Sequence, residues 1–183
     1  MDRRNLQLSL IQSLLAAPGS TEGWECFLAQ LCDALHGSAA RFIAHSLESE
    51  AALAANVSVA VHTDLVAIAE YQQHWGRYDP WRHAMSPDVR AGTVLVGDDL
   101  IARDRISRTA FYNEFGRKYE TTQCLAGILE MSPGRISNIS INRSDSGRRF
   151  SRRDADLLRQ LMPHLRRAID LHRRLSGVEL LTA

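Results

Sequence analysis

The feature that most constrains the fold is a predicted β-hairpin in the second half of the chain. Residues 123–131 (QCLAGILEM) are mostly apolar, which is typical of a strand at the centre of a sheet. Residues 132–135 (SPGR) have Pro in second place and Gly in third, which predicts a type II turn. In residues 136–143, Ile139 and Ile141 alternate with Asn and Ser, so this strand has one apolar and one polar face. Because a tight turn pairs two strands in antiparallel order, the hairpin predicts an antiparallel sheet.

The rest of the chain adds strands and helices to this hairpin. Strict alternation of Val with smaller or polar residues predicts one of the further strands, and the three are expected at residues 41–47, 57–61 and 92–97. Apolar residues at spacings of three and four predict helices near residues 3–16, 20–36, 64–75, 107–119 and 151–175. Hairpins joined by helices predict an α/β (α+β) protein, with a central antiparallel sheet of about five strands and helices on its faces.

Length and charge suggest how the chain is organised. Its 183 residues suit one domain, and we expect a sandwich domain over residues 1–150 with residues 151–183 as its C-terminal helix. Residues 147–176 carry nine Arg and three Asp, whereas residues 1–146 carry 13 basic and 17 acidic side chains. The Arg pairs of the last helix could contact phosphates, form a solvated face or pair with acids across a dimer.

Sequence patterns typical of catalysis, cofactor binding and metal binding are absent. The chain has no GxGxxG, Walker, GxSxG, HExxH or CxxC pattern, and its seven His and three Cys are scattered without ligand spacing. We therefore expect no metal, no cofactor and no catalytic residues, and predict that the protein is not an enzyme. Without a membrane-spanning run or a signal peptide, and with unpaired cysteines, it is predicted to be cytoplasmic with no membrane partner.

An aromatic stretch at residues 71–81 (YQQHWGRYDPW) is the strongest functional signal. Tyr71 and Trp75 share one face if this segment is helical. Asp79 precedes a proline, which predicts a turn directly after the helix. Rings gathered where a helix gives way to a turn could wall a pocket with a carboxylate at its mouth, or could plug one end of a core. Both interpretations are consistent with the spacing.

Four segments resemble one family. Residues 71–81, 92–94 (GTV), 107–115 (SRTAFYNEF) and 163–175 (PHLRRAIDLHRRL) are similar to the N-terminal sensor half of LuxR-type bacterial transcription regulators. The resemblance extends over most of residues 1–176. It implies a GAF- or PAS-like α/β/α sandwich of the autoinducer-binding kind. In such regulators a helix-turn-helix domain follows the sensor, and the 183 residues contain none, so nucleic acid would be contacted only through that missing domain.

The resemblance also implies a ligand and its contacts. In sensors for acyl-homoserine lactones, two aromatic residues bond to ligand carbonyls and an Asp accepts a hydrogen bond from the ligand amide. Tyr71, Trp75 and Asp79 match that order, although the interval from Trp75 to Asp79 is shorter here. The later pocket Trp of those sensors has no evident counterpart in this chain.

We therefore expect a ligand-sensing and dimerising domain for bacterial signal transduction and transcription regulation. Its small, partly apolar signal molecule would be walled by Phe42, Tyr71, Trp75, Tyr78, Asp79, Trp81, Phe111, Phe115, Leu125 and Ile139. A homodimer would form through the last helix at Leu158, Leu161, Leu165, Ile169 and His172, although the same apolar stripe would equally suit a helix lying on its own sheet. The alternatives are a homodimerisation module with a filled core and no ligand, or an unrecognised enzyme of GAF-like fold.

Overall fold

Five strands form one antiparallel sheet, as the sequence predicts. The structure, a computed structural model, describes residues 3–46, 56–86, 88–133 and 135–182. The order across the sheet is β2-β1-β5-β4-β3, and every neighbouring pair is antiparallel. The strands are β1 (Ala39–Ser46), β2 (Val57–Val61), β3 (Val94–Val96), β4 (Gln123–Ser132) and β5 (Arg135–Arg143). The predicted type II turn between β4 and β5 includes Gly134, which lies outside the described residues.

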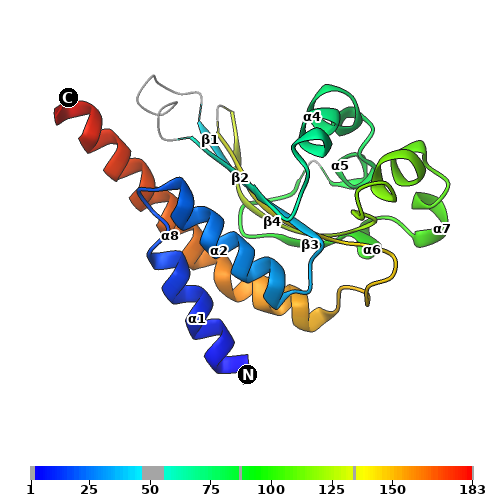
Figure 1. The fold of residues 1–183 in the computed structure, drawn as a ribbon, viewed down its shortest axis with the longest axis horizontal. Helices are drawn as coiled ribbons and strands as arrows, with labels where there is room; N and C mark the ends of the chain where they lie inside the picture. The colour runs from blue at the N-terminus through cyan, green and yellow to red at the C-terminus, as the bar shows by residue number, and fades with distance from the viewer. Residues whose placement is uncertain (1–2, 47–55, 87, 134, 183) are drawn as a thin grey trace.

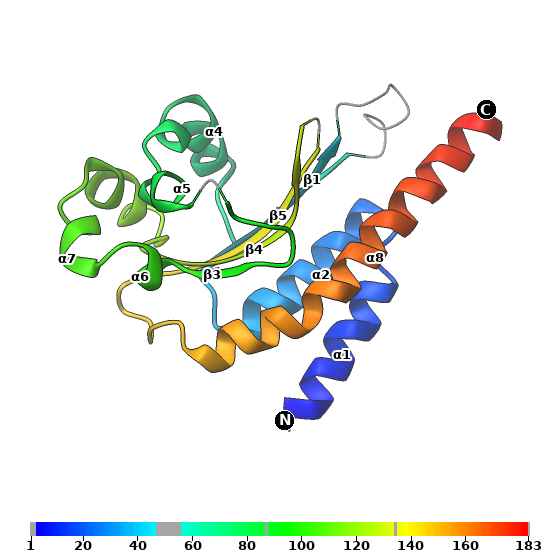
Figure 2. The ribbon, with the colours of Figure 1, turned by 180° about the vertical axis from the view of Figure 1, so that it is seen from behind.

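Helices cover both faces of the sheet but differ in length. Figures 1 and 2 show the long helices together on one face and a group of short helices on the other. The long helices are α1 (Arg3–Leu15), α2 (Thr21–Ala34) and α8 (Arg152–Thr182). The short elements are α4 (Leu65–Gln73), η1 (Trp75–Arg77), α5 (Pro80–Ala84), α6 (Gly97–Leu100), α7 (Arg103–Ile106) and η2 (Phe111–Gly116). This arrangement confirms the predicted fold class, with the main hydrophobic core between the long helices and the sheet.

The last helix is part of this core, which corrects the predicted dimer seam. Leu158, Leu161, Leu165 and Ile169 are at most 2% exposed and belong to the domain's own core. His172 is also used internally, because its Nδ1 accepts hydrogen bonds from Gly19 N–H at 3.1 Å and from Trp24 Nε1–H at 3.3 Å. An apolar stripe at spacings of three and four fits a sheet as well as a second helix. The apolar stripe of α8 therefore packs on the domain's own sheet.

The start of α8 is fixed by a capping box and a buried arginine. The Ser151 N–H donates to Asp154 at 2.7 Å, and the Asp154 N–H donates to the Ser151 hydroxyl at 3.3 Å, which are the reciprocal bonds of a capping box. Arg143 at the end of β5 is 1% exposed and its Nε donates to the Leu35 carbonyl at 2.8 Å. Its guanidinium also lies 3.9 Å from the centre of the Phe150 ring. The arginine thereby connects α2, β5 and α8.

Candidate functional site

Aromatic side chains from two distant segments meet on the face of the sheet covered by the short helices. We call them the aromatic cluster: Tyr71, Trp75, Trp81, Phe111, Phe115 and Tyr119. Neighbouring ring centres are 5.1–6.5 Å apart, mostly in edge-to-face or tilted arrangements. Trp81, Phe111 and Phe115 are buried, whereas Tyr71 and Trp75 are half-buried. Five of the predicted wall residues therefore do lie together, and the cluster is packed at its centre.

Asp79 lies at the edge of the cluster and is almost completely buried. The Tyr71 hydroxyl donates to Asp79 Oδ2 at 2.7 Å, while Oδ1 accepts from the backbone N–H groups of Trp81 at 2.9 Å and Arg82 at 3.3 Å. Asp79 thus caps α5, with Pro80 as the first helical residue. Burial raises the pKa of Asp79 above its ordinary value, although the bonds from Tyr71 and the backbone act in the opposite direction.

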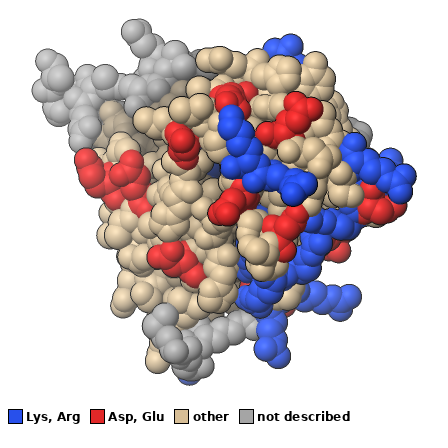
Figure 3. All heavy atoms as spheres, turned by 45° about the vertical axis from the view of Figure 1, so that its right-hand side comes forward, with Lys and Arg blue, Asp and Glu red and all other residues tan. Residues whose placement is uncertain are grey.

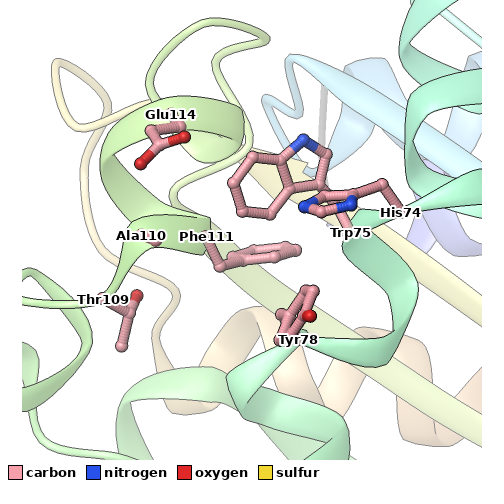
Figure 4. A pocket seen from close by; sticks show the side chains of 7 residues that line it. All are labelled: His74, Trp75, Tyr78, Thr109, Ala110, Phe111 and Glu114. Atoms are coloured by element: carbon pink, nitrogen blue, oxygen red, sulfur yellow. The ribbon is translucent and has the colours of Figure 1, made fainter.

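A surface depression of about 360 Å³ opens on the outer side of the cluster. Figure 4 shows Trp75, Phe111 and Tyr78 beside this hollow, with Glu114 on the η2 side. His74, Thr109 and Ala110 complete its lining. Tyr78 is 53% exposed, so it forms part of the rim and not of an enclosed wall. The depression is therefore open to solvent and separate from the buried carboxylate.

Three predicted wall residues lie on the opposite face of the sheet. Phe42, Leu125 and Ile139 are fully buried in the main core beneath the long helices. Phe42 stacks on Trp24 of α2, with ring centres 4.5 Å apart. We call this side the sealed face. The prediction is wrong for these three residues because side chains alternate along a strand, and the apolar side of each strand faces the larger core.

The neighbouring residues along the same strands form the other side of the sheet, which we call the open face. In contrast with the sealed face, each of these six side chains is partly exposed to solvent. They are Arg41, Ile43, Cys124, Ala126, Asn138 and Ser140. Sequence analysis missed them as site residues. The one available signal was Arg41, a charged residue inside a short apolar strand.

Ionisation behaviour connects the open face with the residues of α4 and α5. Burial lowers the pKa of Arg41, and the Tyr71 phenol acts on it in the opposite direction. Burial raises the pKa of the Cys124 thiol, and the charge of Asp79 acts in the same direction. A candidate site between the open face and α4–α5 would combine rings, a cation, a carboxylate and an unreactive thiol.

Solved structures of other proteins share this fold. The LBD of VqsR from Pseudomonas aeruginosa superposes with a TM-score of 0.66 at 15% identity, covering 96% of this chain and 99% of that one. CepR2 from Burkholderia cenocepacia, described as an N-acylhomoserine lactone dependent LuxR family transcription factor, gives 0.62 at 13% identity, covering 94% and 97%. The chain has the fold of LuxR-type ligand-binding domains. A GAF domain from an Acinetobacter phosphoenolpyruvate-protein phosphotransferase gives 0.53 at 8% identity over 93% of this chain and 95% of that one. No protein-family model and no curated protein sequence matches the chain.

The neighbours share this fold at 8–15% identity, so the likeness concerns the fold alone. Within the described ranges, no group of three or more His, Cys, Asp or Glu side chains is placed to hold a metal ion. In the same part of the chain, no helix has the length and apolar character needed to cross a membrane.

The basic residues near the start of α8 are partly neutralised within the domain. Arg148 pairs with Asp154 at 2.9 Å, and Arg149 pairs with Asp98 at 3.2 Å. Arg103 forms a further ion pair with Asp145. Figure 3 shows the Lys and Arg side chains on this side of the molecule interleaved with Asp and Glu. These contacts support ion pairing as the role of the Arg pairs. The pairing occurs within the chain and not across a dimer.

Proposed function

We propose that this chain is the signal-binding and dimerising domain of a LuxR-type transcription regulator. A small, partly apolar molecule would bind between the aromatic cluster and the open face of the sheet. One observation carries the proposal: one face of the sheet is fully sealed, while the face beneath the rings stays partly accessible beside buried Asp79 and half-buried Tyr71. A structural core alone does not require this asymmetry. The description of CepR2 as lactone dependent makes acyl-homoserine lactones one ligand class to test.

A route from the ligand to the C-terminal helix runs through β4. The strand carries Cys124 and Ala126 on the open face, and its register shifts between Ile128 and Glu130. Directly after the shift, both Glu130 carboxylate oxygens accept hydrogen bonds from Arg173 of α8, at 3.0 and 2.8 Å. A ligand that binds better to one position of β4 would thereby change the packing of α8. A DNA-binding domain following α8 would receive that change.

The dimer surface is proposed on the outer side of the long helices. The inward stripe of α8 is occupied by the domain's own core. The helices α1 and α8 lie side by side (Figure 1), and among the described residues four of their leucines are exposed. They are Leu8, Leu15, Leu171 and Leu175, each more than 40% exposed. Burial of such side chains against a second copy would stabilise a dimer by removing apolar surface from water.

Ligand binding is tested by thermal unfolding in the presence of acyl-homoserine lactones and a fractionated bacterial extract. A ligand at a hundred times its Kd stabilises the protein by about 2.7 kcal/mol, which raises Tm by about 5–10 °C for a chain of this size. Tyr71→Phe removes the hydroxyl that bonds to Asp79 and should reduce the shift, whereas Tyr78→Phe at the exposed rim should not. If no compound or fraction raises Tm, the ligand-free interaction module becomes the better interpretation.

Dimerisation is tested by light scattering across protein concentrations. The double substitution Leu171→Glu with Leu175→Glu should yield a monomer, because it places charge within the proposed interface. Leu65→Glu is the matched control, since Leu65 is 81% exposed at the start of α4, on the other face of the sheet. A wild-type protein that remains monomeric at all concentrations would contradict this part of the proposal.

A further inference from the structure

Arg41 occupies a central position on the open face of the sheet. It lies on β1, between β2 and β5, and its direct cross-strand neighbours are Ala60 and Ser140. The next residue along the same row is Ala126 on β4. Leu95 on β3 completes the row. Arg41 therefore has small direct neighbours on both sides, Ala60 and Ser140.

The guanidinium of Arg41 has no counter-charge in the part of the chain that the structure describes. None of the described residues forms a hydrogen bond or an ion pair with it. Asp79, the carboxylate of the site, already accepts from Tyr71 and from two backbone N–H groups. Burial lowers the pKa of Arg41. A half-buried cation without a partner is unfavourable, and a bound anion would offset that cost.

Further hydrogen-bonding groups lie on the same face beside Arg41. Ser140 is its direct partner on β5, and Asn138 lies two residues along the same strand, opposite Ile43. Both side chains are partly exposed. Tyr71, whose phenol acts electrostatically on Arg41, links this polar group to the aromatic cluster. A cation, a hydroxyl and an amide thus lie next to a wall of aromatic rings.

We infer that the signal molecule is an acid whose carboxylate binds Arg41, Ser140 and Asn138 while its apolar or aromatic body lies against the aromatic cluster. This inference rests on the proposed function and specifies the ligand class. The planar guanidinium matches a carboxylate through two parallel N–H···O bonds. A single positive charge balances one carboxylate, whereas a phosphate monoester would leave a second negative charge uncompensated in a half-buried site.

The test compares acids with neutral analogues of the same body. Decanoate is paired with decanamide, and N-decanoyl-homoserine with its lactone, and Kd values are measured by calorimetry on the full chain. Since hydrogen bonds to charged groups contribute about 1.5–3 kcal/mol, each acid should bind about 10- to 100-fold more tightly than its neutral partner. Arg41→Gln should bring the ratio of the Kd of the neutral compound to the Kd of the acid to about 1. Arg108 is an exposed arginine on the α7–η2 connection, and Arg108→Gln should leave that ratio unchanged.

The outcomes separate this inference from the proposed function. Arg41→Gln should leave Tm without ligand unchanged or higher, because it removes an unpaired charge; a marked loss of Tm would show that Arg41 is structural and would overturn the inference. Neutral compounds that bind as tightly as the acids, or an unchanged ratio in Arg41→Gln, would also overturn it while leaving ligand sensing intact. Failure of every acid and every neutral compound to bind would overturn the inference and count against the proposed function as well.

Discussion

Asp79 permits a direct test of the energetics of the site. Its side chain is 7% exposed and burial raises its pKa, so the folded protein binds a proton more tightly than the unfolded chain. The free energy of unfolding should therefore fall as pH rises from 3.8, the ordinary pKa of Asp, through the pKa of Asp79 in the folded protein. Above the folded pKa, the whole cost of burying the charge applies. Asp79→Asn keeps an oxygen that can accept from the backbone of α5 but removes the charge. We expect this variant to be at least as stable as wild type at pH 7, with the difference narrowing towards pH 4.

Asp79→Ala provides the comparison that gives a magnitude. Both variants lose the charge and the oxygen that accepts from the Tyr71 hydroxyl. The Asn amide N–H can instead donate to that hydroxyl, whereas Ala leaves it without a partner and also loses the acceptor for two backbone N–H groups. Loss of the helix cap costs about 1 kcal/mol, and a buried hydroxyl left without a partner costs about 1–3 kcal/mol. Asp79→Ala should therefore be about 2–4 kcal/mol less stable than Asp79→Asn, which corresponds to about 4–16 °C in Tm.

The measurement is urea unfolding followed by tryptophan fluorescence at pH 7, 5.5 and 4. Asp170→Asn, an exposed carboxylate on α8, serves as a control for the loss of one negative charge. The reasoning is refuted if Asp79→Asn is as destabilised as Asp79→Ala at pH 7. A stability difference between wild type and Asp79→Asn that does not change with pH would equally show that the buried charge carries no penalty.

Three further substitutions probe the frame around the site. Arg143→Ala should lower the free energy of unfolding by about 3–5 kcal/mol, since it leaves the Leu35 carbonyl without its donor and removes one of the two cations beside the buried Asp154 carboxylate. Exposed Arg166→Ala should change it by less than about 0.5 kcal/mol, and equal effects of the two substitutions in urea unfolding would contradict this. Gly97→Ala places a Cβ 2.5 Å from Trp81 Nε1. Tryptophan fluorescence should therefore change, and the free energy of unfolding should fall by about 1–3 kcal/mol. An unchanged fluorescence spectrum would refute the contact. Glu130→Gln weakens the bond to α8 and should cost about 1–3 kcal/mol, whereas an unchanged urea midpoint would show that the bond does not hold α8 to β4.

The order of most elements could be predicted from the sequence because it depends on local chemistry, although the helix expected at residues 107–119 is only the short η2 at Phe111–Gly116. Alternation in residues 57–61 and 136–143 identifies strands, and both are strands in the structure. Ser151 with Asp154 marks the start of the last helix through bonds between residues three apart. Pro163 lies inside α8, where a proline ordinarily kinks or divides a helix, yet α8 continues through it as one helix. Helix and strand periods thus fixed the architecture of sheet and helices without tertiary information.

The composition of the site was decided only by tertiary structure. A period of two shows that a strand has two faces but not which layer each face meets, so Phe42 was predicted for the site and Arg41 was missed. An apolar stripe on α8 likewise does not reveal whether its partner is a sheet or a second chain. The long helices bury the larger apolar area and therefore take the apolar face of every strand. The polar face is left beneath the aromatic cluster, where Arg41 lies.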